Sequence, residues 1–171
     1  MATMFLQRIK KAAAITAAFV SVLACEKIDT PRRIQKGDSL PPFSVVMNTG
    51  KTITDSELSS GNSLIVFFHT ECPDCIRELE ELQPFYDKYS EELQIVLISR
   101  AEEEKEILTF WKQNGYTMPF SAQKDRKTYE LFSNSGIPFV VFTVNGKVVR
   151  TWDDKTIFNE QEYLSIKAKQ I

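Results

Sequence analysis

The sequence has few residues that ligate metals: its 171 residues include one His and three Cys. A structural zinc site takes four ligands, commonly two Cys-x-x-Cys pairs or one such pair with histidines. Only Cys72 and Cys75 form a pair, and no cysteine follows them. Covalent haem attachment needs a histidine directly after the pair, and Ile76 stands there. These shortages argue against zinc and haem sites, so we expect no metal and no cofactor other than the two sulfurs.

The sequence also lacks an excess of positive charge. Its formal net charge is −2; the first 24 residues hold three cations (Arg8, Lys10 and Lys11) and no acid, which leaves −5 for the remainder. A mildly acidic domain lacks the basic surface with which proteins bind nucleic acid. Charge would not attract it to anionic lipid either, so contact with a membrane would need another device.

The apolar run near the N-terminus is short. Residues 12–24 number 13, whereas a membrane-spanning helix needs about 20. Cations precede this run and Cys25 follows it, an arrangement typical of an exported protein's signal peptide. The residues Val22-Leu23-Ala24-Cys25 resemble the lipobox of bacterial lipoproteins, which implies lipidation of Cys25 as the mature N-terminus. Cleavage after Ala24 without lipid, or an uncleaved anchor, are the alternatives.

The length allows one domain behind a targeting segment. We predict a signal peptide at 1–24, a tether at 25–36 and a domain at 37–171. Apolar periodicity and turn residues predict strands at 43–47, 51–54, 63–68, 93–98, 117–121, 139–144 and 147–152, and helices at 73–90, 102–114, 127–132 and 159–169. Strands that are apolar throughout alternate with helices, which is typical of an α/β fold whose central sheet is covered on both faces.

Two local features sharpen this prediction. Asn145-Gly146 between the last two strands is a strong signal for a tight hairpin, so the sheet should be mixed. The helix at 102–114 should point four apolar residues inward. These are Ile107, Leu108, Phe110 and Trp111.

The candidate site is the segment Cys72-Pro73-Asp74-Cys75, where a buried strand gives way to a helix. Cys72 falls at the N-cap and Pro73 at the first helical position, where a missing N–H does no harm. A sulfur at the N-cap faces unpaired N–H groups and the positive end of the helix dipole, which favour its thiolate. Cys75 lies one turn deeper, within reach to attack a mixed disulfide on Cys72. The pair therefore predicts a thiol–disulfide oxidoreductase.

On these residues, the region from about 37 to 169 resembles the thioredoxin-like family of membrane-tethered bacterial thiol–disulfide reductases, the ResA/TlpA group. The resemblance implies a thioredoxin fold with an N-terminal hairpin and an inserted helix-strand unit near 102–121. A glutamate follows the motif by three positions in that family, and Glu78 stands there. The Gly136-Ile137-Pro138 segment matches the family loop with a cis-proline. Pro138 would then lie against the sulfurs, and the Ile137 backbone would pair with a client chain.

Two departures affect the predicted chemistry. Thioredoxin has a buried aspartate six positions before its first cysteine, and this chain has Val66. Glu78 is then the candidate for the proton of Cys75, and its alternative is a solvated helix charge. The second departure is Glu71, where the family usually has Trp. The negative charges of Glu71 and Asp74 oppose ionisation of Cys72. A less stabilised thiolate favours a reductase over an oxidase.

Two other functions are alternatives within the same fold. A thiol peroxidase resembles this fold but has the pattern Pro-x-x-x-Thr-x-x-Cys, whereas Thr70 here precedes Cys72 with one residue between. A copper-binding assembly factor has Cys-x-x-x-Cys and a distant histidine, whereas the spacing here is two residues and His69 is adjacent.

The leading prediction is a reductase anchored in the cell envelope, or periplasm, by lipid on Cys25. Its catalytic residues would be Cys72, Cys75, Glu78 and Pro138, and its substrate-binding residues Ile137, Pro73 and Asp74. Its partners would be disulfide-containing client proteins and a membrane electron donor, with no nucleic acid.

Overall fold

The computed structural model describes residues 33–169. The predicted signal peptide, Cys25 and most of the tether lie outside these residues. The described elements, in chain order, are β1 (Ser44–Val46), β2 (Thr52–Thr54), the 3-10 helix η1 (Glu57–Ser59), β3 (Asn62–Phe68), α1 (Pro73–Tyr89), β4 (Gln94–Ser99), α2 (Glu104–Asn114), β5 (Phe120–Ser121), α3 (Lys127–Glu130), β6 (Phe139–Val144), β7 (Lys147–Asp153) and α4 (Glu160–Ala168). Within them, no helix is both long and apolar enough to cross a membrane.

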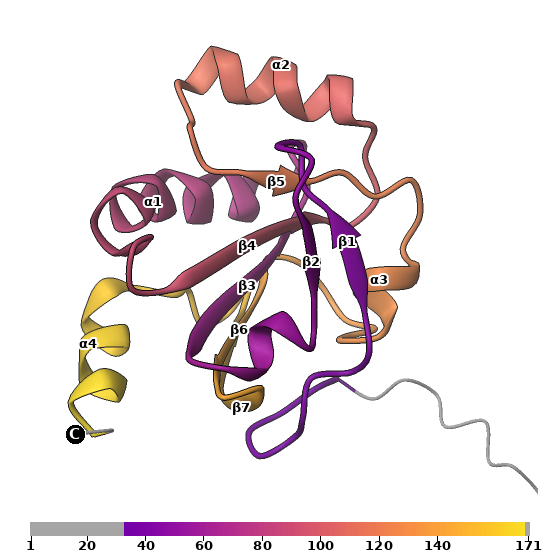
Figure 1. Ribbon diagram of the computed structural model, residues 1–171. Coiled ribbons are helices and arrows are strands. Elements are labelled where there is room, and N and C mark those ends of the chain that lie inside the picture. The colour runs from indigo at the N-terminus through magenta and orange to yellow at the C-terminus, as the bar shows by residue number, and fades with distance from the viewer. Residues whose placement is uncertain (1–32, 170–171) are drawn as a thin grey trace, which may run out of the picture.

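The main sheet has five strands in the order β5-β4-β3-β6-β7 (Figure 1). β3, β4 and β5 run parallel, and β6 and β7 are antiparallel to their neighbours. The predicted α/β fold with a mixed central sheet is therefore confirmed. β1 and β2 form a separate two-stranded sheet, the expected N-terminal hairpin, and α2 with β5 is the expected helix-strand unit.

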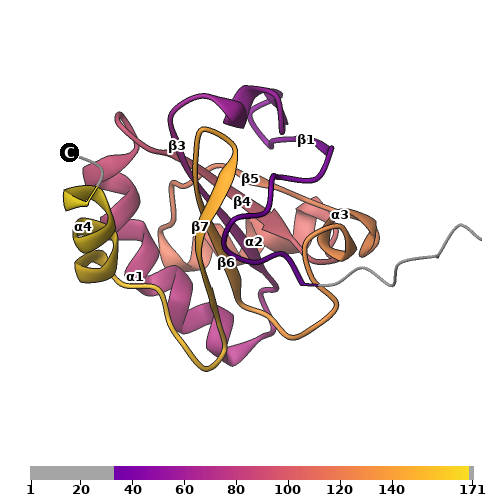
Figure 2. The same ribbon diagram turned by 90° about the horizontal axis from the view of Figure 1, so that it is seen from below.

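Neighbouring residues of β3 point to opposite faces of this sheet, as successive residues of a strand must. The ring of Phe68 lies 5.2 Å from that of Trp111 in α2, on the face that also carries α1 and α4. The ring of Phe67 lies 5.4 Å from that of Tyr129 in α3, on the other face (Figure 2). Helices thus cover both faces, and β3, which positions the site, is buried between them.

Helices α1 and α4 lie side by side in both ribbon views (Figures 1 and 2). The rings of Phe85 and Tyr163 meet edge to face, 5.2 Å apart. At the surface Lys88 pairs with Glu160 at 2.5 Å. This packing holds the far end of α1 firmly, so the position of its first turn is set by the fold.

The Asn145-Gly146 turn forms the predicted hairpin between β6 and β7. Asn145 and Gly146 have positive φ angles of 50° and 71°, which this turn type requires. A Cβ on Gly146 would also lie 3.2 Å from the Ser59 Cα, so η1 packs closely against the turn. The Asn145 side chain also accepts a 2.9 Å hydrogen bond from the N–H of Gly61, just after η1. The sequence patterns did not predict η1.

The predicted inward face of α2 is partly wrong. Ile107 and Trp111 are buried, but Leu108 is 47% exposed and Phe110 is only half-buried. Because β5 has only two residues, the sheet beneath α2 is narrow and covers a smaller stripe of the helix than the apolar pattern suggested.

Candidate active site

Cys72 caps helix α1. Its backbone is extended (φ −89°, ψ 114°), and Pro73 is the first helical residue, as predicted. The Cys72 Sγ accepts a hydrogen bond of 3.4 Å from the N–H of Cys75. The N–H of Cys72 donates to the carbonyl of His69 at 3.1 Å, which closes a turn between β3 and α1. A sulfur is thereby fixed among the free N–H groups of the helix start.

Cys75 lies fully buried one turn along the helix, while Cys72 is half-exposed. Both are free thiols. Burial raises the pKa of the Cys75 thiol above its usual value, and a hydrogen bond with the Cys72 side chain raises it further. The two sulfurs therefore differ in exposure and acidity: the outer one is accessible, and the inner one is buried with a raised pKa.

The loop before β6 meets this pair. The Ile137–Pro138 peptide bond is cis, as the family resemblance implied. The Cys72 thiol donates to the carbonyl oxygen of Ile137 across 3.6 Å. Ile137 and Pro138 are both buried. The structure thus brings together the two cysteines and the two loop residues that the sequence analysis had selected.

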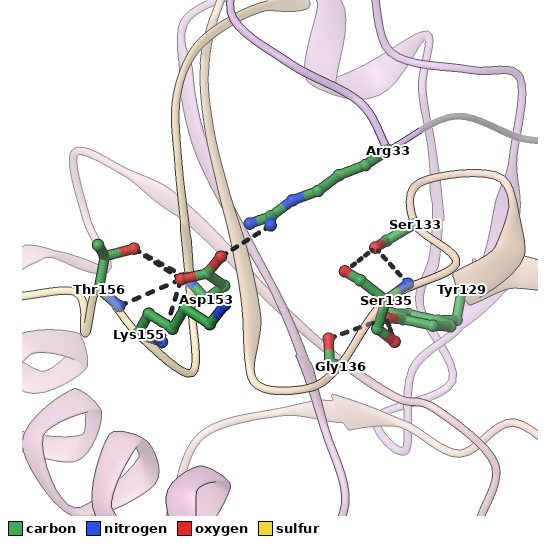
Figure 3. A network of polar contacts seen from close by, with 8 residues as sticks. All are labelled: Arg33, Tyr129, Ser133, Ser135, Gly136, Asp153, Lys155 and Thr156. Carbon is green, nitrogen blue, oxygen red and sulfur yellow. Dashed lines mark hydrogen bonds and ion pairs between the residues drawn. The ribbon is translucent and has the colours of Figure 1, made fainter.

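This loop is held from inside the domain by helix α3. The hydroxyl of Tyr129 lies 2.6 Å from the carbonyl oxygen of Ser135 and 2.9 Å from that of Gly136 (Figure 3). The hydroxyl groups of Ser133 and Ser135 are 2.8 Å apart. Nothing in the sequence pattern distinguished Tyr129 from an ordinary core residue.

Glu78 is buried in the face of α1 that carries Cys75, with 1% of its surface exposed. Neither of its carboxylate oxygens has a hydrogen-bond partner among the described residues. Burial raises the pKa of Glu78 from 4.5 to about 7. A contact with the Phe158 backbone, which falls short of a well-formed hydrogen bond, opposes this rise, and the charge of Glu81 adds the smallest contribution, in the same direction as burial. A solvated helix charge, the alternative for Glu78, is therefore wrong.

A second buried acid, which the sequence motifs did not single out, lies beside the site. Glu102 is 6% exposed, accepts the N–H of Thr70 at 2.9 Å and also contacts the Thr70 hydroxyl. The His69 Nδ1 lies 3.6 Å from the same carboxylate. The carboxyl ends of parallel strands share one edge of a sheet, so polar residues just after β3 and β4 were a usable signal. Glu102 fixes the turn that leads into Cys72.

The acids expected to oppose ionisation of Cys72 lie at the surface. Glu71 is exposed, and the carboxylate of Asp74 contacts the guanidinium of Arg77 in a partly exposed ion pair. This ion pair reduces the influence of Asp74 on the sulfur. Pro73 is exposed beside it, so both predicted substrate-binding residues of the helix start are accessible. Among residues 33–169, no cluster of three or more His, Cys, Asp or Glu side chains could hold a metal ion.

Residues 36–150 match the AhpC/TSA family over most of the domain. The chain belongs to this family. The chain is similar to "Thiol-disulfide oxidoreductase ResA" of Bacillus cereus, with 28% identity over 119 residues that cover 68% of this chain and 69% of the relative. The predicted ResA-type, thioredoxin-like protein is confirmed, and with it the prediction of an oxidoreductase.

Solved structures support the same fold. StoA from Bacillus subtilis superposes with a TM-score of 0.63 at 19% identity, over 75% of this chain and 97% of that one. A PrxQ mutant from Xylella fastidiosa reaches 0.64 at 15% identity, over 81% of this chain and 97% of that one. At these identities the likeness concerns the fold alone, so a choice between exchange and peroxidase chemistry depends on the site.

Proposed function

We propose that this AhpC/TSA-family protein is a thiol–disulfide reductase that acts on disulfides of client proteins through Cys72 and Cys75. The observation that carries the proposal is the contact of the Cys72 sulfur with the Ile137 carbonyl, 3.6 Å away, while Cys75 lies buried one turn behind. An accessible nucleophile, a resolving thiol and a docking loop are thereby in one place.

In the first step the Cys72 thiolate attacks one sulfur of a client disulfide. The client S–S bond breaks, its other sulfur leaves as a thiolate, and a mixed disulfide with Cys72 forms. In the second step the Cys75 thiolate attacks Cys72, which releases the second client thiolate and leaves a Cys72–Cys75 disulfide. The client gains two electrons, and an electron donor must return two electrons to the pair before the next cycle.

Glu78 is proposed to accept the proton that Cys75 must lose before it attacks. The two residues are three apart on α1, and both are buried in its inner face. A general base works best with a pKa near the working pH, and burial brings the pKa of Glu78 to about 7. Glu78 would thereby take the role of the buried aspartate of thioredoxin. At the position of that aspartate this chain has Val66, which is buried and apolar.

Clients are proposed to bind as an extended segment beside Ile137, with Pro73 and Asp74 contacting its other side. Main-chain hydrogen bonds from a loop or strand edge give affinity for many sequences, which suits an enzyme with varied clients. Pro138 would hold Ile137 against the sulfur. We further propose that residues 1–24 are a signal peptide and that lipid on Cys25 anchors the domain in the cell envelope, where a membrane protein supplies electrons.

The test of this function is insulin reduction by the purified chain, with Cys25→Ser as the matched control. Cys72→Ser should abolish turnover, Cys75→Ser should accumulate mixed disulfides that gel electrophoresis resolves, and the control should keep full activity. Full activity in Cys72→Ser would contradict the assignment. Rapid loss of thiols with stoichiometric peroxide would instead favour a peroxidase, although the Thr70 hydroxyl is directed to Glu102 in this structure.

A further inference from the structure

Tyr129 occupies an unusual position for a core tyrosine. It is fully buried, and its hydroxyl lies within hydrogen-bond distance of two successive carbonyl oxygens, those of Ser135 and Gly136 (Figure 3). A tyrosine has one O–H, so this hydrogen is shared between two acceptors or alternates between them. Both carbonyls belong to the loop that ends in the cis Ile137–Pro138 bond.

The ring of Tyr129 is itself fixed by β3. It meets the ring of Phe67 edge to face, with centroids 5.4 Å apart, and Phe67 is fully buried near the end of the strand that leads to Cys72. One aromatic contact therefore connects the strand below the nucleophile with the helix that holds the docking loop. The hydroxyl has little freedom to follow the loop if the loop moves.

The bonds of Tyr129 also determine what the loop can present. They turn the carbonyls of Ser135 and Gly136 toward the interior, and the next carbonyl, that of Ile137, faces the Cys72 sulfur at 3.6 Å. A second contact on the same loop joins the hydroxyls of Ser133 and Ser135 at 2.8 Å. The conformation of Ile137 is thereby set by contacts on the side of the loop that faces the domain interior.

We propose that the Tyr129 hydroxyl is a positioning residue for client binding, which holds the loop so that the Ile137 backbone is ready to pair with a protein substrate. The proposal rests on the reductase function given above and extends it to a residue that touches neither client nor sulfur. A loop that already has its bound conformation loses less conformational entropy when a client binds, so the affinity is higher. The hydroxyl therefore contributes to affinity for extended polypeptides much more than to the reactivity of the sulfur, which contacts this loop through the Ile137 carbonyl.

The test separates these two effects with two substrates. Insulin needs the loop, whereas a small aromatic disulfide such as Ellman's reagent reacts at Cys72 without a main chain to pair. Tyr129→Phe keeps the ring and removes the hydroxyl. We expect the KM for insulin to rise by about tenfold, because the loss of one hydrogen bond leaves a loop carbonyl without its partner. The rate with the small disulfide should change less than about twofold.

Tyr163→Phe is the matched control, because Tyr163 is also buried and its hydroxyl donates to Glu92 at 3.1 Å, away from the loop. It should leave both rates unchanged. Ser133→Ala, which removes the second contact on the loop, should reproduce the effect of Tyr129→Phe in smaller measure and serves if that variant folds poorly. Equal losses on both substrates, no change on either, or the same pattern in Tyr163→Phe would overturn the proposal.

Amide hydrogen exchange gives a reading that does not depend on the reaction. Exchange at residues 135–137 should accelerate in Tyr129→Phe, while exchange in β4 stays as in the unmodified chain. If the unmodified chain fails to reduce insulin, the proposed function fails, and faster exchange would still establish the hold on the loop. Unchanged exchange at 135–137 would overturn the positioning role even in an active enzyme.

Discussion

The sulfur of Cys72 and the carbonyl oxygen of Ile137 lie 3.6 Å apart, although 65 residues separate them in the chain. The thiol hydrogen of Cys72 is directed at the same backbone that a client would use for pairing. In the proposed reaction, a docked client would compete for this carbonyl when its disulfide reaches the sulfur. Binding and attack would then share one small surface, bounded by the start of α1 and the loop before β6.

The two thiols should differ strongly toward alkylation. Cys72 is half-exposed at the helix start, whereas Cys75 is fully buried and burial raises the pKa of its thiol. Because the thiolate is the reacting species, brief treatment of the reduced protein with iodoacetamide at pH 7.5 should label Cys72 more than about a hundredfold faster. Peptide mass spectrometry measures the ratio. Comparable labelling of both in the folded protein would contradict the assignment of attacking and resolving roles.

The buried acid Glu78 should make stability depend on pH. Its pKa is about 7 in the folded protein against 4.5 when solvated, so between these values the folded state holds the extra proton. Stability from this group is therefore complete below pH 4.5 and is lost as the pH rises toward 7, by about 3 kcal/mol in all. In Glu78→Gln this loss should disappear.

Urea unfolding at pH 4.5 and pH 8 tests this, with Glu80→Gln as control because Glu80 is exposed on the same helix. The difference in unfolding free energy between Glu78→Gln and the unmodified chain should grow in favour of the variant by about 3 kcal/mol between the two pH values. The control should show no such change. A constant difference would mean that Glu78 is already solvated in the folded protein.

Insulin reduction by the same variant should also slow at the step that forms the Cys72–Cys75 disulfide.

Glu102 should matter for stability although it lies outside the cysteine motif. Its carboxylate accepts the N–H of Thr70 at 2.9 Å, and its removal leaves that donor without its partner. Glu102→Ala should cost about 1–3 kcal/mol of unfolding free energy. Glu103→Ala is the control, since Glu103 is exposed and makes no side-chain bond at the start of α2. Equal effects of the two substitutions would show that the contact with Thr70 contributes nothing.

Local patterns predicted most of the fold because the local causes were strong. The apolar run that became β3 is typical of a strand buried on both faces, and Asn145-Gly146 is a strong signal for a hairpin turn. The position of Cys72 before Pro73 predicted a capped helix for the same reason. The exposure of Leu108 could not be read this way, because it depends on how narrow the neighbouring sheet is.

The parts of the site that the patterns missed depend on pairings distant in sequence. Thr70 and Glu102 are 32 residues apart, and their contact exists only because β3 and β4 run parallel and end together. Tyr129 looked like an ordinary apolar residue, because its two acceptors are backbone atoms and leave no signature in the sequence. Glu78 was selected only through the family resemblance; an acid in a helix rich in acids is otherwise taken as solvated.

The direction of electron flow can be decided by the reduction potential of the Cys72–Cys75 pair. Strongly oxidising enzymes stabilise the reduced form with a cation between the cysteines, and this chain has Pro73 and Asp74 there. We therefore expect equilibration against a glutathione series to give a potential below about −200 mV, toward the −270 mV of reductases and away from the −120 mV of oxidases. Asp74→His should raise the potential by tens of millivolts, because an imidazolium beside the Cys72 sulfur favours its thiolate. Asp87→His, on an exposed turn of α1 distant from the cysteines, is the control and should leave the potential unchanged. A potential near −120 mV in the unmodified chain would make the protein an oxidase and reverse the proposed direction.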